Sequence, residues 1–263
     1  MAVKEVKGSS QSMRIGGASI AWITLYGALC GVTSLIPVFP YVGGGGYVPL
    51  QTMFSAIAPM LLGGVGGIVA ATVGGIIGMF IAPAAFPLQL VDVFLTGTLP
   101  AFAVALMMNA NKRWLFAAIW CVVVGIIGTL FPFYVPGAAA GFASPANPVS
   151  YFLMVAYYWL IPLVIVLSPL GRRMLPDWIR GQDRKYKYIG IGLTFITGLF
   201  TWFLPWSLPY WYVYQYEPSM GVATLLGYMW WVPLFALVIT LITVPLVEAL
   251  RRSGLPKIPG AIW

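Results

Sequence analysis

Residues 38–86 read VFPYVGGGGYVPLQTMFSAIAPMLLGGVGGIVAATVGGIIGMFIAPAAF, and they contain no Asp, Glu, Lys, Arg or His. A glycine run at 43–46 leads into one apolar segment, and a glycine turn at 63–67 connects it to a second. Water-soluble domains do not keep so long a run without charge. In a bilayer such a run is expected, because small residues let helix backbones approach closely where the hydrophobic effect cannot drive association.

The composition of the whole chain supports the same interpretation. Of its 263 residues, 60% are hydrophobic and 8% are charged, whereas soluble domains carry about 25% charged residues. The sequence therefore predicts an all-α integral membrane protein, in which residues 1–263 form a single polytopic membrane domain.

Eight apolar segments are expected to cross the membrane, with the N- and C-termini both cytoplasmic. Residues 1–16 are predicted as a cytoplasmic tail, and residues 174–263 as a basic inner loop followed by two further helices. The second segment is short and contains Pro59. The eight segments are about residues 17–37, 49–62, 64–82, 90–108, 114–134, 151–170, 188–206 and 222–250.

The basic residues favour this topology in a plasma membrane. The net charge is +8, from 14 Lys+Arg and 6 Asp+Glu. With eight crossings, the Lys112/Arg113 loop, the loop at 172–187 and the Arg251/Arg252 tail all lie inside. The loops assigned outside, 38–48, 84–89, 135–149 and 207–221, contain no Lys or Arg. This is the positive-inside pattern, so the excess charge is not interpreted as nucleic-acid binding.

Several kinds of chemistry are not expected in this chain. It has no histidine, which removes haem ligation by His, most zinc sites and the usual general base. Cys30 and Cys121 both lie in apolar segments and are interpreted as small buried hydrophobes. The glycine run is followed by Tyr-Val-Pro-Leu and not by the lysine of a phosphate-binding loop. We therefore predict no enzyme, no cofactor and no metal site.

The loops assigned to the outer side carry the side chains of a binding site. Aromatic rings with a few amides and one carboxylate suit a flat small molecule with a polar edge. The candidate ligand-binding residues are Tyr41, Gly44, Tyr47, Gln51, Gln89, Asp92, Asn147, Tyr210, Trp211 and Glu217. The alternative is that the aromatic residues only anchor the protein as an interfacial belt, to which Trp202, Trp206, Tyr210, Trp211 and Tyr212 would belong.

The two acidic residues near the membrane interior have competing interpretations. Asp92 opens the fourth segment, where a carboxylate can cap a helix or accept a hydrogen bond from a ligand. Glu248 lies within one turn of Arg251 and Arg252 and is expected to pair with them.

The first segment carries two pairs of small residues at a spacing of four, Gly17/Ala21 and Gly27/Gly31. Such pairs form contact faces for another helix. That helix belongs either to this chain or to a partner, and the sequence leaves both alternatives open.

From about residue 17 to residue 173 the sequence resembles the substrate-binding S component of energy-coupling-factor (ECF) vitamin transporters. A first segment rich in small residues is followed by an outer Pro/Gly loop, a short second segment, a glycine turn and a glycine-rich third segment. A basic inner turn follows the fourth segment. The residues that carry the resemblance are PYVGGGG at 40–46, VPLQTMF at 48–54, LLGGVGG at 61–67 and AATVGGIIG at 70–78.

The resemblance implies a high-affinity membrane receptor for a micronutrient. Such a protein docks onto a transmembrane coupling subunit that is powered by two cytosolic ATPases. In that family the first helix presents small residues to the coupling subunit, here Gly17, Ala18 and Ala21. The outer loop that closes over the substrate corresponds to residues 40–47. S components usually have six spans, so the last two of the eight expected here would be an addition.

Two other kinds of function stay open at this point. The small-residue faces and the aromatic surface also suit a structural or accessory subunit of a larger membrane complex. An integral membrane enzyme, a channel or a stand-alone carrier is the third alternative.

Overall fold

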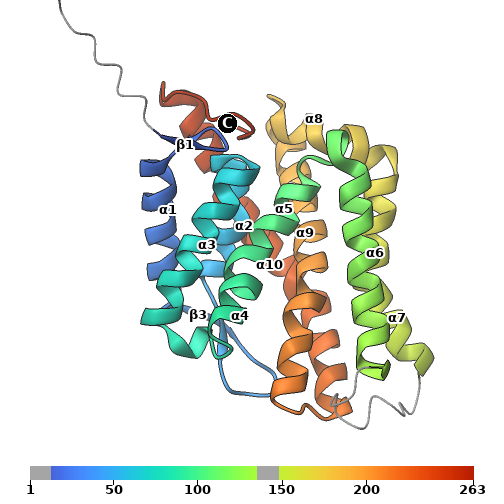
Figure 1. Cartoon of the computed structure of the whole chain (residues 1–263). Helices are drawn as coiled ribbons and strands as arrows, with labels where there is room; N and C mark the ends of the chain where they lie inside the picture. The colour runs from blue at the N-terminus through green and yellow to red at the C-terminus, as the bar shows by residue number, and fades with distance from the viewer. Residues whose placement is uncertain (1–12, 135–147) are drawn as a thin grey trace, which may run out of the picture.

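The structure, a computed structural model, describes residues 13–134 and 148–263. In these ranges the chain is almost entirely helical, with two short antiparallel strand pairs (Figure 1). One pair joins β1 (Arg14–Ile15) to β2 (Ala18–Ser19), and the other joins β3 (Pro37–Pro40) to β4 (Tyr47–Pro49). The predicted helical class is confirmed for this part of the chain.

The helices follow one another along the chain, with β3 and β4 between α1 and α2. The fourth predicted segment is a composite, in which a π-helical stretch, η2, separates two α-helical pieces. In chain order the helices are α1 (Ile20–Thr33), α2 (Gln51–Leu62), α3 (Gly64–Ile81), η1 (Pro83–Ala85), α4 (Leu90–Asp92), η2 (Val93–Thr98), α5 (Leu99–Met107), α6 (Ala110–Tyr134), α7 (Pro148–Leu167), η3 (Leu170–Met174), α8 (Leu175–Arg180), α9 (Arg184–Val213) and α10 (Pro218–Arg252).

Five helical segments among the described residues are long and apolar enough to cross a membrane. They are Gly64–Ile81, Leu90–Met107, Ala110–Leu130, Arg184–Val213 and Ser219–Arg252, with a sixth if Tyr151–Leu167 and Leu170–Arg180, bent by 71°, form one span. This fits a multi-pass helical membrane protein. Of the eight predicted crossings, the first two correspond to α1 and α2, which have 14 and 12 residues. At 1.5 Å per residue each is shorter than the roughly 30 Å hydrocarbon core.

Successive long helices run in alternating directions between two ends of the molecule (Figure 1). We call the end with β1, α8 and the carboxyl end of α10 the basic end. The opposite end, which holds β3, β4, the start of α4 and the carboxyl end of α9, is the hairpin end. Every Lys and Arg of the described ranges lies in an element or connection at the basic end.

The tail segment, residues 253–263, folds back over the basic end and closes the carboxyl end of α2. The Ile262 amide donates to the Met60 carbonyl at 2.9 Å. The Trp263 indole donates to the Leu61 carbonyl at 2.7 Å. The last carbonyls of a helix have no partner within the helix, and here residues distant in the sequence supply the donors.

Glu248 pairs with α9 and not with its own helix. Its carboxylate lies 3.8 Å from the Lys187 ammonium and 3.9 Å from the Arg184 guanidinium. The expected pairing with Arg251 and Arg252 is therefore wrong. Arg251 instead donates to backbone carbonyls, because its guanidinium reaches across to the connection between α8 and α9 and to the tail segment.

One small-residue pair of the first segment packs inside the chain. Gly27 and Gly31 are buried on α1 and face α3. A Cβ at Gly27 would lie 2.8 Å from the Val73 side chain, and one at Gly31 would collide with Ile77. This confirms the intrachain alternative for the Gly27/Gly31 pair, since only glycine lets the two backbones come so close.

Two of the three residues expected at a partner interface are also wholly or partly covered within the chain. Gly17 precedes the helix with φ +91°, and a Cβ there would lie 2.6 Å from the Pro259 ring. Ala18 is fully buried in β2, against Gly66. Ala18 is therefore not accessible to a partner helix, whereas Gly17 is half-buried and its place in a partner face stays a prediction. Ala21 remains exposed on α1 beside Leu25 and Ala28.

The glycine-rich stretch at 63–67, where α2 ends and α3 begins, allows a test of how closely the two helices pack. A Cβ at Gly67 would collide with the backbone nitrogen of Pro59 and lie 2.5 Å from the carbonyl carbon of Ala58. A Cβ at Gly64 would meet Ala105 at an ordinary 3.7 Å. We expect Gly67→Ala to lower the free energy of unfolding by about 2 kcal/mol, because backbone atoms cannot yield as a side chain can. Chemical unfolding in detergent micelles measures the change, and Gly64→Ala, expected to unfold like the parent, is the control.

The aromatic residues near residue 206 lie in the core and not in an interfacial belt. Helix α9 continues through Pro205 and Pro209 to Val213, so Tyr210 and Trp211 lie on a helix and not in the predicted loop. The largest exposed fraction among Trp202, Trp206, Tyr210 and Trp211 is 3%. The belt interpretation is therefore wrong for these four residues.

Candidate functional site

The glycine run forms the tip of an ordered hairpin. Tyr41 and Gly46 close the tip by an amide-to-carbonyl bond of 3.1 Å, and the Gly44 amide donates to the Tyr41 carbonyl at 3.0 Å. Gly44 and Gly45 have φ values of +79° and +83°, a conformation that favours glycine. The outer loop expected between the first two segments is thus a hairpin, whose position is set by Tyr41, the residue that follows β3.

Tyr41 anchors this hairpin to the helices. Its ring lies edge-on to Trp206 and Tyr210, with centroids 5.5 and 5.0 Å apart. Its hydroxyl lies 3.3 Å from the Tyr210 hydroxyl and 3.4 Å from the Ala85 carbonyl. Burial raises the pKa of the Tyr41 hydroxyl far above its ordinary value, so the group is protonated and can donate at neutral pH.

Asp92 is the next group in this hydrogen-bonded chain after Tyr41 and Tyr210, and it is fully buried. The Tyr210 hydroxyl donates to Oδ1, and the Leu88 amide donates to Oδ2 at 2.6 Å. No Lys or Arg of the described ranges forms an ion pair with it. A carboxylate removed from water without a cation depends on such hydrogen bonds for its stability. Asp92 thus fixes the chain just before α4 at the hairpin end, and its binding to a ligand stays a prediction.

The π-helical stretch after Asp92 holds the aromatic face of α9 in place. The Trp202 indole donates to the Leu95 carbonyl at 2.7 Å, and the Trp206 indole donates to the Thr96 hydroxyl at 3.0 Å. A π-helical turn shifts the regular hydrogen bonds of a helix and is frequent at functional sites. In this molecule it lets the fourth segment accept from two buried tryptophans.

A second polar group lies at the first turn of α2. The Ser34 hydroxyl donates to Gln51 Oε1, and the Tyr47 hydroxyl donates to the Ser34 carbonyl at 3.1 Å. Gln51 Nε2, Thr52 Oγ1 and the Ser55 hydroxyl are buried without a hydrogen-bond partner among the described residues. Buried polar atoms of this kind are uncommon and call for an explanation, such as a role in binding.

The structure brings together part of the predicted set. Tyr41, Asp92 and Tyr210 form one hydrogen-bonded chain, which we call the Tyr–Asp cluster, and Tyr47 and Gln51 meet through Ser34. The other predicted residues take no part in these hydrogen bonds. Trp211 is buried on α9; Gly44, Gln89 and Glu217 are exposed; and Asn147 lies outside the described residues.

The recess beside the Tyr–Asp cluster is filled by side chains. It has a volume of about 10 Å³, close to the minimum that holds a single water molecule. A small organic molecule therefore does not fit there while the hairpin is seated. The lining residues are Tyr41, Val42, Trp206, Ser207, Trp211, Tyr216, Thr224 and Tyr228.

Sequence reasoning did not assign Ser34, Trp202, Trp206 or Tyr228 to the site. One signal was present, because Trp202, Trp206 and Tyr210 recur at a spacing of four and so share one face of a helix. The two prolines at 205 and 209 hid it, since they favoured ending the helix at residue 206. Prolines are tolerated within membrane helices, where neighbouring groups satisfy the freed carbonyls.

No family model, curated protein or solved structure matches this chain. The resemblance to S components therefore rests on the sequence stretches quoted above.

Proposed function

We propose that this chain is the membrane-embedded substrate-binding subunit of a small-molecule uptake transporter, of the kind that S components form. The observation that carries the proposal is the Tyr–Asp cluster. A buried carboxylate without a cation partner among the described residues lies at the hairpin end, bonded to Tyr210 and covered by Tyr41. Buried ionisable groups within membrane segments are costly and mark functional sites by default.

The proposed orientation follows from the distribution of charge. The basic end gathers the Lys and Arg residues of the described ranges, and cytoplasmic loops carry an excess of these residues. We therefore assign the basic end to the cytosol and the hairpin end to the outside of the plasma membrane. Because α1 and α2 are each shorter than the hydrocarbon core, eight crossings require the β3–β4 hairpin to span the remaining thickness of the membrane at the hairpin end.

Ligand entry in this proposal requires the hairpin to move. Its anchor, Tyr41, packs on two rings and shares its hydroxyl with Tyr210. Displacing it opens Asp92 and the aromatic face of α9 from the outside. The ligand class is a flat small molecule with N–H or O–H donors for Asp92 and an acceptor for Gln51 Nε2, as a vitamin or a base-like compound would offer.

Energy coupling is assigned to separate subunits, namely a transmembrane coupling subunit and cytosolic ATPases. The face for the coupling subunit is the exposed side of α1 with Ala21, Thr24 and Ala28, because small residues permit close helix contact. This face keeps Ala21 of the predicted residues and leaves out Ala18, which is buried.

Ala21→Leu tests that assignment. The added side chain would project from the exposed side of α1 and hold a partner helix away, so we expect the partner subunits to be lost on affinity purification. Ala223→Leu alters another exposed alanine, on α10 near the hairpin end, and is the matched control. Equal recovery of partners by both variants would place the interface elsewhere.

A structural or accessory subunit of a membrane complex is the second candidate. The filled recess of about 10 Å³ favours it, because a permanent structural role needs no ligand cavity. In that case the buried Asp92 would serve only to fix the start of α4 against Tyr210.

Mass spectrometry of small molecules released from the protein decides between the two candidates. The full chain, purified in mild detergent from cells grown on rich medium, is denatured and its extract compared with that of an unrelated membrane protein prepared identically. We expect one enriched compound in near one-to-one amount. An extract indistinguishable from that of the unrelated protein, together with recovery in a fixed complex without ATPases, would establish the structural role.

A further inference from the structure

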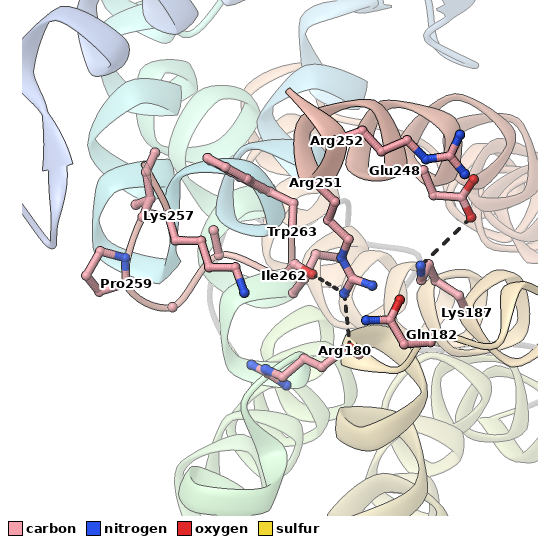
Figure 2. A pocket seen from close by; sticks show the side chains of 13 residues that line it. Arg180, Gln182, Lys187, Glu248, Arg251, Arg252, Lys257, Pro259, Ile262 and Trp263 are labelled. Carbon is pink, nitrogen blue, oxygen red and sulfur yellow. Dashed lines mark hydrogen bonds and ion pairs between the residues drawn. The ribbon is translucent and has the colours of Figure 1, made fainter. Parts of the chain in front are cut away.

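A cavity at the basic end lies away from the Tyr–Asp cluster. Its volume is about 740 Å³, and Figure 2 shows side chains from the α8 region, α9, α10 and the tail segment arranged around it. Five cationic side chains and one carboxylate, Glu248, line it. The cationic residues are Arg180, Lys187, Arg251, Arg252 and Lys257.

Two of the five cations, Arg180 and Arg251, are held by neutral acceptors, which do not cancel their charge. Arg251 donates to the carbonyls of Gly181, Arg180 and Ile262 at 2.9, 3.0 and 2.6 Å, respectively. Arg180 donates to the Met108 carbonyl and, at 3.1 Å, to the amide oxygen of a neighbouring asparagine. These bonds fix the guanidinium groups in place, but carbonyl and amide oxygens leave their full charge. The cavity is therefore a preorganised anion site.

Lys257 differs from those arginines. It is exposed in the tail segment and has no hydrogen bond or ion pair within the described chain. Figure 2 shows its side chain extended from the tail toward Arg251. It also lines a second recess of about 200 Å³, together with Arg14 and Ser19. Lys257 is thus a cation that a ligand can engage without displacing an existing partner, as is Arg252, but of these two only Lys257 also lines the second recess.

An apolar groove of about 390 Å³ adjoins both recesses. Ile258 lines all three, and Trp263 lines the groove and the basic cavity. The groove opens on the exposed side of α1, where Leu25 is 66% and Leu29 is 45% exposed. Its complete lining is Trp22, Leu25, Tyr26, Leu29, Leu61, Leu62, Leu246, Leu250, Ile258 and Trp263.

The chemistry of this junction is amphiphilic. A ligand that fills it has an anionic head for Lys257 and the basic cavity, and a hydrocarbon chain for the groove. Basic pockets between membrane helices bind anionic lipid head groups in this way. We propose that the junction binds an anionic phospholipid from the leaflet bordering the basic end, with its phosphate beside Lys257 and one acyl chain in the groove. This proposal is independent of the transported ligand.

The test measures lipid retention by native mass spectrometry of the full chain. The protein is offered phosphatidylglycerol and phosphatidylcholine with identical acyl chains at equal concentration. We expect at least a fivefold preference for phosphatidylglycerol. Lys257→Gln should reduce it to near one, whereas Lys185→Gln, which alters an exposed lysine outside these recesses, should keep it. An unchanged preference in Lys257→Gln would overturn the proposal.

Two further arms separate a lipid from a soluble anion. Leu25→Trp adds bulk to the groove, and Leu153→Trp makes the same change at a position on α7 that is 68% exposed. Only the first should lower phosphatidylglycerol retention, by several-fold. Inorganic phosphate in large excess should leave the bound lipid in place. Its complete release by phosphate would show that the cavity binds a free anion and not a lipid. Equal retention by both tryptophan variants would show that no acyl chain lies in the groove, and either result overturns the proposal.

Discussion

Asp92→Ala is expected to lower the free energy of unfolding by about 3 kcal/mol. The substitution removes the acceptor for two buried donors, the Tyr210 hydroxyl and the Leu88 amide, and each donor left without a partner costs about 1–3 kcal/mol. Asp92→Asn keeps one acceptor oxygen and should lose much less. Chemical unfolding of both variants in detergent micelles measures the difference, and an alanine variant as stable as the parent would contradict the described hydrogen bonds.

The same position separates a structural role from a ligand-binding role. If the carboxylate binds a donor of the transported molecule, Asp92→Asn should weaken binding at least tenfold while the protein stays folded, because charge-assisted hydrogen bonds are roughly twice as strong as neutral ones. The control is Asp177→Asn, an exposed carboxylate on α8. Binding equal to that of the parent in both variants would leave Asp92 with the structural role alone.

Arg251→Ala is expected to destabilise the basic end by about 3 kcal/mol. Its guanidinium joins three parts of the chain, because it donates to carbonyls of the α8–α9 connection and to the Ile262 carbonyl in the tail segment. Hydrogen bonds from a charged group contribute about 1.5–3 kcal/mol each, and partial exposure of Arg251 lowers the total. Chemical unfolding measures the loss, and limited proteolysis should cleave the released tail segment first.

Arg252 provides a control of the same charge at the next position. Its side chain is exposed and forms no ion pair or hydrogen bond within the described chain. Arg252→Ala should therefore unfold like the parent, since an exposed charge contributes little to stability. Equal losses in the two variants would show that charge, and not the three carbonyl bonds, holds the basic end together.

The helical segments were predictable because each depends on local composition. Runs without charge, ended by glycine or by basic residues, placed most of the eight segments within a few residues of helices in the structure. The exception is the seventh, predicted to end at residue 206, because α9 continues to Val213, and α1 and α2 are shorter than a span needs. The contact role of the glycine pair at 27 and 31 was also predictable, since small residues four apart form a contact face wherever the partner helix lies. The sequence did not decide which helix that was, and α3 occupies it.

The errors concern which side of a helix faces the core. Trp206 and Tyr210 were assigned to the membrane interface as one interpretation, because aromatic residues at a segment end are typical of that belt. The same residues fill the core, because the hairpin at 37–49 folds under them. No local sequence pattern predicts that contact, since Tyr41 and Tyr210 are 169 residues apart. The partners of Glu248 were unpredictable for the same reason. It pairs with Arg184 and Lys187 on α9, which are distant in the sequence, and not with the arginines one turn away.

The hydrogen bonds from the tail segment to the carboxyl end of α2 can form only late in the synthesis of the chain. The carbonyl of Leu61 receives its donor from Trp263, 202 residues further along the chain. At translation rates of about 5–20 residues per second, that delay lasts roughly 10–40 s. During this interval the early helices are already in the translocon or the lipid, with the carboxyl end of α2 still open. The carboxyl end of α2 is therefore closed only after the ribosome has made all the helices of the described chain.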